Sequence, residues 1–187
     1  PVIQPPVRSP QLEWVTKSMY DAIYYTLHNL DPEAFQRAVD LMKNAKLLYW
    51  YGAGESGMMG EIGNHRCWHL GIDSYVFRET LDVTNFSMLR DQGAVFIFLS
   101  VSGEGPYLVK PLEMVKRENL TCIAITSSHF SPLTEAAAVV LRAASPRSKL
   151  RNSIIPIKAG FEAIVNALLY ETAKERGIPL ELTTEMF

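Results

Sequence analysis

Five short apolar runs, separated by loops and helical patterns, constrain the architecture of this chain more than any other feature. The first is apolar from Leu47 to Tyr51 and the others are largely apolar. Such runs, bounded by turn residues, are typical of strands buried on both faces of a parallel sheet. We expect them at 46–51, 72–77, 94–99, 120–125 and 138–142. Helical stretches between them are expected at roughly 55–70, 84–90, 106–118 and 131–137. Strand–helix alternation with short connections predicts a three-layer, doubly wound α/β fold with a five-stranded parallel sheet.

Helical patterns also precede and follow the sheet region. Residues 11–30 carry apolar side chains at helical spacing, as an amphipathic helix requires: Leu12, Val15, Met19, Ile23, Leu27 and Leu30. A second helix restarts at Asp31, which can cap it, and Pro32 suits its first turn. A long final helix runs from about 154 to Arg176 and is closed by Gly177. The expected organisation is a single domain: an extended lead-in at 1–10, two N-terminal helices at 11–45 that pack on the rest of the domain or on a partner, and the sheet region at 46–187.

Composition excludes several classes of protein. The 187 residues include 18 Lys+Arg and 20 Asp+Glu, which gives a net charge of -2. Proteins whose whole surface binds nucleic acid or an anionic membrane are strongly basic, so this class does not fit. No apolar run approaches the ~20 residues that cross a bilayer. Cys67 and Cys122 have apolar neighbours, which predicts buried, reduced thiols in a cytoplasmic protein. The histidines and cysteines lack metal-ligand spacing, and we expect neither a metal nor a cofactor. Because the chain opens on Pro1 rather than Met, we expect a segment upstream.

The first predicted strand ends in a glycine-rich loop, residues 52–57, with the sequence GAGESG. Gly52 and Gly54 allow a tight turn and a close approach to a ligand, and the following helix start offers unpaired N–H groups to an anion. Ser56 adds a hydroxyl donor. The same letters fit the G-x-G-x-x-G dinucleotide fingerprint, with Glu79 as the acid for a ribose. A tight turn without a ligand is a third interpretation.

A second loop, residues 100–105, follows the most apolar strand and has the sequence SVSGEG. Ser100 and Ser102, followed by Gly103 and Gly105 at a helix start, would supply hydroxyls and backbone N–H groups to one small anion. A dinucleotide fold has no need of this second loop, whereas a phosphomonoester held between two helix N-termini does. The alternative is that the two serines only cap the next helix.

The pair of loops resembles the SIS, or sugar isomerase, fold, in which the first strand ends in G-x-G-x-S and the third in S-x-S-G-x-T. The similarity covers most of residues 31–170. It is closest to the sugar-sensing domain of RpiR-type bacterial transcriptional regulators, whose two-helix lead-in matches Thr26-Leu27, Leu30-Asp31, Phe35, Ala38-Val39, Leu41-Met42 and Ala45-Lys46. The resemblance implies a cytoplasmic effector domain that binds a sugar phosphate and forms a homodimer or tetramer. It would not bind a membrane, and it would reach DNA only through an N-terminal domain that is not in this sequence.

Carried over residue by residue, the resemblance implies phosphosugar contacts at Gly52, Gly54, Ser56, Ser100, Ser102, Gly103 and Gly105. Sugar contacts are also expected from Glu79, Thr126 and Arg151. The alternative for the basic loop around Arg151 is a connecting segment exposed to solvent, without a ligand. Three departures from the pattern stand out. Gly105 replaces the threonine of the family, Glu55 puts a carboxylate beside the first loop, and Pro111 removes a helical donor.

An isomerase is the alternative function. His69, in the sequence HLG, and Glu162, in a partial PxGxxFE pattern, are similar to positions in hexulose-phosphate isomerases of this fold. Lys158 replaces a glycine of that pattern. Aldose–ketose isomerisation needs a base that moves a proton between adjacent carbons, and these two residues are the candidates. A His at a helix end is also favoured by the helix dipole alone, and a Glu in an early turn is commonly solvated. We therefore expect a binding domain without catalytic residues.

Overall fold

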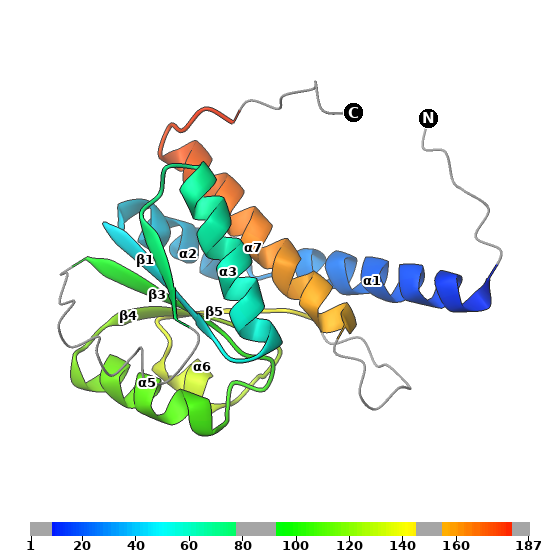
Figure 1. The fold of residues 1–187 in the computed structure, drawn as a ribbon, viewed down its shortest axis with the longest axis horizontal. Coiled ribbons are helices and arrows are strands. Elements are labelled where there is room, and N and C mark those ends of the chain that lie inside the picture. The colour runs from blue at the N-terminus through cyan, green and yellow to red at the C-terminus, as the bar shows by residue number, and fades with distance from the viewer. Residues whose placement is uncertain (1–8, 78–92, 145–154, 181–187) are drawn as a thin grey trace.

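The computed structural model describes residues 9–77, 93–144 and 155–180, with side chains from 158 onward in the last segment (Figure 1). It contains five parallel strands in the order β2-β1-β3-β4-β5, which confirms the predicted sheet. The strands are β1 (Leu47–Gly52), β2 (Ser74–Phe77), β3 (Ala94–Leu99), β4 (Thr121–Thr126) and β5 (Val139–Arg142). Each begins within two residues of its predicted start.

The described helices also follow the sequence pattern. They are α1 (Pro10–His28), α2 (Pro32–Asn44), α3 (Glu55–His69), α5 (Pro106–Arg117), α6 (Pro132–Ala136) and α7 (Ile155–Glu175). Helix α1 begins at Pro10, one residue before the predicted start. Asp31 caps α2 as predicted, because its carboxylate accepts from the N–H groups of Glu33 and Ala34. The helix predicted at 84–90 lies outside the described residues.

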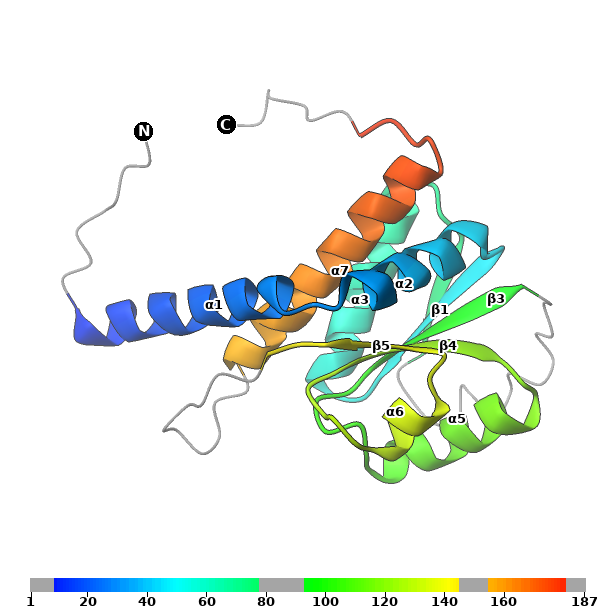
Figure 2. The same ribbon diagram turned by 180° about the vertical axis from the view of Figure 1, so that it is seen from behind.

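Successive residues of the central strands lie in two separate cores. Leu48 and Trp50 of β1 pack with α2, α3 and α7 on one face of the sheet. Tyr49 and Tyr51 pack with α5 and α6 on the other face, where β3 adds two phenylalanines. Figures 1 and 2 show these helices on the two sides of the sheet. Burial on both faces explains why the strand sequences do not alternate between apolar and polar residues.

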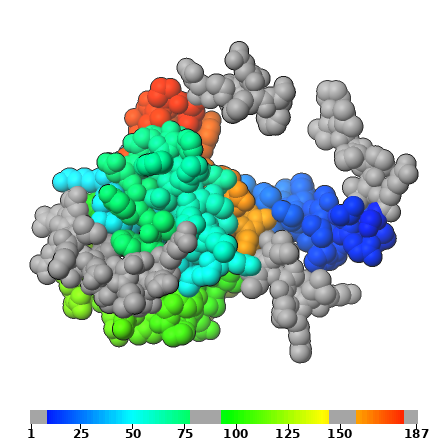
Figure 3. Space-filling view, viewed as in Figure 1, coloured from blue at the N-terminus to red at the C-terminus, as the bar shows by residue number. Residues whose placement is uncertain are grey.

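Helix α1 packs on the domain through only a small part of its surface. Its buried residues are Ala22 and Thr26, which lie against α7. The Thr26 Oγ1 accepts from the Ala144 N–H at 2.9 Å, and it lies 2.6 Å from where a Cβ on Gly160 would stand. The predicted apolar stripe is exposed instead, and Leu12 retains 60% of its surface. The N-terminal half of α1 extends away from the sheet (Figures 2 and 3).

Pro111, the irregularity in α5, is compensated by a side chain from β1. A proline has no N–H, so the carbonyl four residues earlier, that of Tyr107, loses its helical partner. The buried Tyr51 hydroxyl donates to this Tyr107 oxygen at 2.6 Å. The hydroxyl thereby replaces the missing helical hydrogen bond and ties β1 to the start of α5.

The two cysteines are buried and unpaired, as predicted. Burial raises the pKa of the Cys122 thiol to about 11 and also raises that of Cys67, so both thiols stay protonated. Among the helices that the structure describes, none has the length and hydropathy needed to cross a membrane.

Candidate functional site

The two glycine loops lie where the strand order reverses. Strand β1 stands between β2 and β3. The chain places β2 on one side of β1 and then adds β3, β4 and β5 on the other side. The helix after β1 covers one face of the sheet, and the helix after β3 covers the other. In such sheets a crevice opens at the carboxyl ends of the two strands. The loops at 52–57 and 100–105 border this crevice.

In the first loop, the backbone of Gly52 lies close to the backbone of the first turn of α3. A Cβ on Gly52 would lie 2.6 Å from the Ser56 carbonyl carbon, and a Cβ on Gly57 would lie 2.8 Å from the Gly52 oxygen. Gly54, with φ +56°, is the N-cap of α3, and no side chain caps this helix. Of the first three N–H groups of α3, that of Ser56 donates to the Ala53 carbonyl at 3.1 Å, and those of Glu55 and Gly57 have no partner among the described residues. These two are open to an anion.

The second loop also ends at an uncapped helix. Gly105, with φ +133°, is the N-cap of α5, and no side chain caps it, so the alternative of capping by the two serines is wrong. Pro106 follows at the first helical position and contributes no N–H. By contrast, Ser131 caps α6 through a full capping box. The two helices at the crevice thus lack the side-chain caps of α2 and α6, and α1 lacks one as well.

The serines of the second loop have different surroundings. Ser100 is 1% exposed, and its Oγ accepts from the Gly103 N–H at 3.1 Å and lies 3.0 Å from the Tyr107 hydroxyl. The Ser102 hydroxyl is exposed and donates to the Glu104 carbonyl at 3.0 Å. Ser100 therefore shapes the loop, whereas Ser102 presents its hydroxyl to the solvent.

Thr126 supports the loops rather than the crevice. It is fully buried, its Oγ1 donates to the Val101 carbonyl at 3.2 Å, and it accepts from the Ser128 N–H at 3.1 Å. These bonds use the hydroxyl hydrogen and one lone pair of Thr126, and its expected contact with a sugar stays a prediction. The other two expected sugar contacts, Glu79 and Arg151, lie outside the described residues.

Lys158 is a residue of the site that the sequence analysis missed. Its Nζ reaches across from α7 and donates to the Ser56 Oγ at 2.7 Å, and it lies 5.2 Å from the centre of the Phe161 ring. Burial lowers the pKa of the Lys158 ammonium below its usual value, and the nearby Glu55 carboxylate partly opposes this shift. The only signal in the sequence was the replacement of a glycine by lysine in the partial isomerase pattern.

The two candidate catalytic residues do not meet at the crevice. The Glu162 carboxylate pairs with Arg66 of α3 at 2.8 Å. His69 is exposed at the last turn of α3, with its Nε2 3.1 Å from that of His65. At roughly 1.5 Å per residue, His69 stands about 20 Å along α3 from Ser56. Joint action of His69 and the first loop within one copy of the chain is therefore excluded.

Residues 41–169 match the SIS domain, a match that covers both loops and all five strands. The chain belongs to the SIS domain family. Among curated proteins, the SIS domain is 28% identical over 127 residues to the "Bifunctional protein glk" of Paraburkholderia xenovorans, covering 68% of this chain and 20% of that protein. It is 26% identical over 133 residues to an uncharacterized HTH-type transcriptional regulator of Haemophilus influenzae, covering 71% of this chain and 46% of the regulator. The chain thus spans a fifth to a half of these relatives.

Solved structures share the fold of this SIS domain. The sugar isomerase domain of the RpiR transcription factor from Sphaerobacter thermophilus superposes with a TM-score of 0.77 at 25% identity, over 90% of this chain and 92% of that one. NanR of Vibrio vulnificus, solved in complex with ManNAc-6P, gives a TM-score of 0.80 at 19% identity, over 91% of this chain and 67% of NanR. The predicted resemblance to RpiR-type SIS domains is confirmed.

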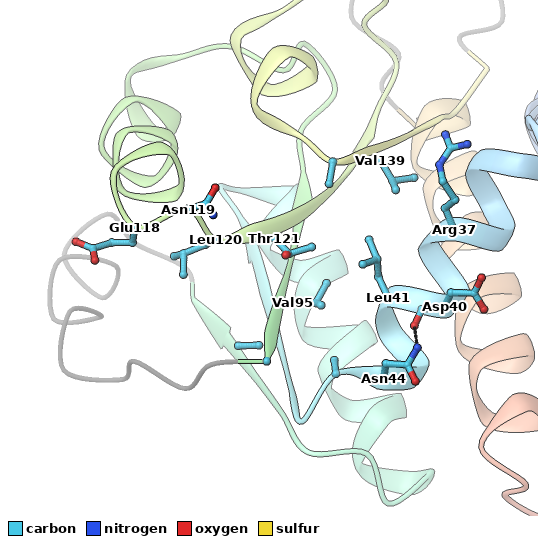
Figure 4. Close-up of a pocket in the computed structure, with 14 residues that line it drawn as sticks. Arg37, Asp40, Leu41, Asn44, Val95, Glu118, Asn119, Leu120, Thr121 and Val139 are labelled. Carbon is cyan, nitrogen blue, oxygen red and sulfur yellow. Dashed lines mark hydrogen bonds between the residues drawn. The ribbon is translucent and has the colours of Figure 1, made fainter.

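A separate pocket of about 860 Å³ opens at the opposite end of the sheet in this SIS domain (Figure 4). Arg37, Asp40 and Leu41 of α2 line it, together with residues at the starts of β3, β4 and β5. The C-terminal ends of α2 and α5 border this pocket, and their carbonyls disfavour an anion. Despite its volume, this pocket is a poorer phosphate site than the crevice between the loops.

Proposed function

We propose that this SIS domain binds a phosphorylated sugar at the two glycine loops and acts as the sensing domain of a cytoplasmic transcriptional regulator. The DNA-binding domain of that regulator would lie outside this chain. The observation that carries the proposal is the pair of uncapped helix N-termini, α3 and α5, which start beside the same crevice. The N-terminus of α3 offers open N–H groups, and the positive dipole ends of both helices favour an anion between them, which suits a phosphate group.

The relatives support the same reading. One structural neighbour is a complex of NanR with a sugar phosphate, and another is a domain of an RpiR transcription factor. Two curated relatives, from Haemophilus influenzae and Clostridium perfringens, are HTH-type regulators. A chain that spans only part of such regulators fits the role of their ligand-binding portion.

The test is calorimetric titration of the chain with N-acetylmannosamine 6-phosphate, glucosamine 6-phosphate, glucose 6-phosphate and fructose 6-phosphate. We expect Ser102→Ala to weaken binding of the tightest of these about tenfold or more, since a hydrogen bond to a charged group is worth roughly 1.5–3 kcal/mol. Stability should barely change, because the hydroxyl is exposed. The matching sugars without phosphate, and NAD, serve as controls that should not bind. If no phosphate ester binds, the proposal is wrong.

Isomerase activity is the competing function, and the distance between His69 and the first loop argues against it within one copy of the chain. NMR of hexulose 6-phosphates incubated with the protein follows the formation of isomers directly. Turnover that Glu162→Gln abolishes would overturn the sensing proposal in favour of catalysis.

We further infer that α1 pairs two copies of the chain. Large apolar side chains are exposed along it, including Trp14, Val15 and Met19, and an apolar groove of about 810 Å³ lies between α1 and α7. Exposed apolar side chains along one helix are typical of an interaction surface, and a two-fold axis lets such a surface cover its own copy. Light scattering should give a dimer mass or its multiple, and Val15→Glu should halve the mass, whereas Lys17→Glu, on the same helix, should not. A monomeric wild type would contradict this inference.

A further inference from the structure

The contact between Lys158 and Ser56 joins a cation to the first loop from a distant part of the chain. The donor lies in the first turns of α7, and the acceptor lies in the first turn of α3, 102 residues earlier. Neither glycine loop contains a lysine or an arginine. Lys158 therefore supplies positive charge that the loops themselves do not have.

The ammonium of Lys158 is only partly compensated. The Glu55 carboxylate attracts it and partly opposes the lowering of its pKa by burial. Within the described part of the chain, however, it has no carboxylate within salt-bridge distance, and its described contacts are the Ser56 hydroxyl and the Phe161 ring. The side chain is half-buried, so water compensates the charge only in part. A half-buried cation beside an uncapped helix N-terminus is unfavourable without an anion, because both carry positive charge.

The direction of the hydrogen bond matters for the ligand. Lysine can only donate, so the Ser56 oxygen accepts and its own hydrogen is free for another acceptor. Ser56, at 7% exposure, is held in place by its N–H bond to the Ala53 carbonyl. The ammonium, the Ser56 hydroxyl and the open N–H groups of α3 can thus all donate to one acceptor-rich group. A phosphomonoester dianion offers that number of acceptor oxygens and the opposite charge.

We propose that Lys158 is the cationic phosphate ligand of this site and that the site is therefore built for a phosphomonoester dianion rather than for a neutral sugar. The inference rests on the proposed sugar-phosphate function and deepens it. Ser56 and Lys158 act together, because the lysine both orients the serine hydroxyl and contacts the phosphate. Gly105 lacks the threonine hydroxyl of the family pattern, and the Lys158 ammonium would supply a phosphate contact in its place.

The experiment measures the affinity for inorganic phosphate and for the four sugar 6-phosphates by calorimetry, in wild type, Lys158→Met and Lys158→Arg. Loss of a charge-assisted contact should weaken binding about 10- to 100-fold in Lys158→Met, and Lys158→Arg should retain more affinity than Lys158→Met. Lys116→Met, at the exposed far end of α5, removes the same charge and should leave the affinity unchanged.

The outcomes separate the two proposals. If wild type binds and Lys158→Met binds equally well, the role of Lys158 is overturned while the sensing function stands. If wild type binds no phosphate ester, both fall. Thermal melts of the unliganded variants add a second readout, because a purely structural lysine would lower the melting temperature of Lys158→Met without affecting affinity. If Lys158→Met does not fold, the wild type is treated by reductive methylation with and without phosphate, and modification of Lys158 is measured by mass spectrometry with Lys116 as the reference. Phosphate should protect Lys158 and not Lys116, and equal modification of Lys158 with and without phosphate would overturn its role.

Discussion

Gly103→Ala is expected to lower the free energy of unfolding by about 2–5 kcal/mol, since it combines backbone strain with overpacking. Gly103 has φ +69°, which L-residues rarely adopt, and a Cβ there would overlap the Ser131 Oγ. Relief requires the loop at 100–105 to move away from α6, whose Leu133 N–H donates to the Gly103 carbonyl at 3.1 Å. The same movement displaces Ser102, so sugar-phosphate affinity should fall with stability. Urea denaturation and calorimetry measure the two effects.

The chain contains a matched control for this prediction. Gly177 has φ +68° but no atom within 4 Å of the added Cβ, so Gly177→Ala carries only the backbone strain, about 1–2 kcal/mol. The difference between the two variants is therefore the cost of overlap. Ser131→Gly removes the overlapping atoms while keeping a tolerated N-cap residue, and in that background Gly103→Ala should cost no more than Gly177→Ala. Equal costs for Gly103→Ala in both backgrounds would contradict the contact.

The fold was predictable because its signals are local. Apolar runs, helical spacing and helix start and stop signals such as Asp31-Pro32 and Gly177 depend on residues within a few positions of one another. With right-handed crossovers, they predict a parallel sheet covered on both faces. The packing of α1 was not predictable in the same way. Helical spacing in residues 11–30 identifies an apolar stripe but does not show what covers it. Within one copy of the chain, the side of the helix that faces α7 is the one that carries the small residue Ala22.

In the candidate site, too, local features were predictable from the sequence and long-range contacts were not. The sequences of both loops identified the glycines that permit tight turns and positive φ, because such positions need particular residue types. Sequence could not distinguish the exposed Ser102 from the buried Ser100, since that difference arises from the Tyr107 side chain packed beside the loop. It also could not find the Lys158–Ser56 contact, which joins positions 102 residues apart through the placement of α7 over α3. Long-range packing decides which polar groups face a ligand.

Gly52→Ala should be the most damaging single methyl group in the first loop, lowering the free energy of unfolding by about 3 kcal/mol or more. The added Cβ would lie 2.6 Å from the Ser56 carbonyl carbon, 2.7 Å from its oxygen and 2.9 Å from the Gly57 nitrogen. All three are backbone atoms of α3, so no side-chain rotation relieves the overlap. The helix must shift away from β1, and its N-terminus then leaves the crevice together with the Ser56 hydroxyl.

Gly60→Ala, one turn further along α3, is the control that isolates this effect. Its Cβ would meet the Val76, Trp50 and Leu99 side chains at 3.4–3.8 Å, which is ordinary contact, and the helix gains about 0.5–1 kcal/mol from the better propensity of alanine. Denaturant unfolding should therefore separate the two variants by several kcal/mol in opposite directions. Phosphate affinity should fall in Gly52→Ala only, because only that substitution moves the end of α3 that would face the anion. A Gly52→Ala protein as stable as wild type would mean that β1 and α3 do not approach as closely as the structure has them, and the crevice would then lack its tightest constraint.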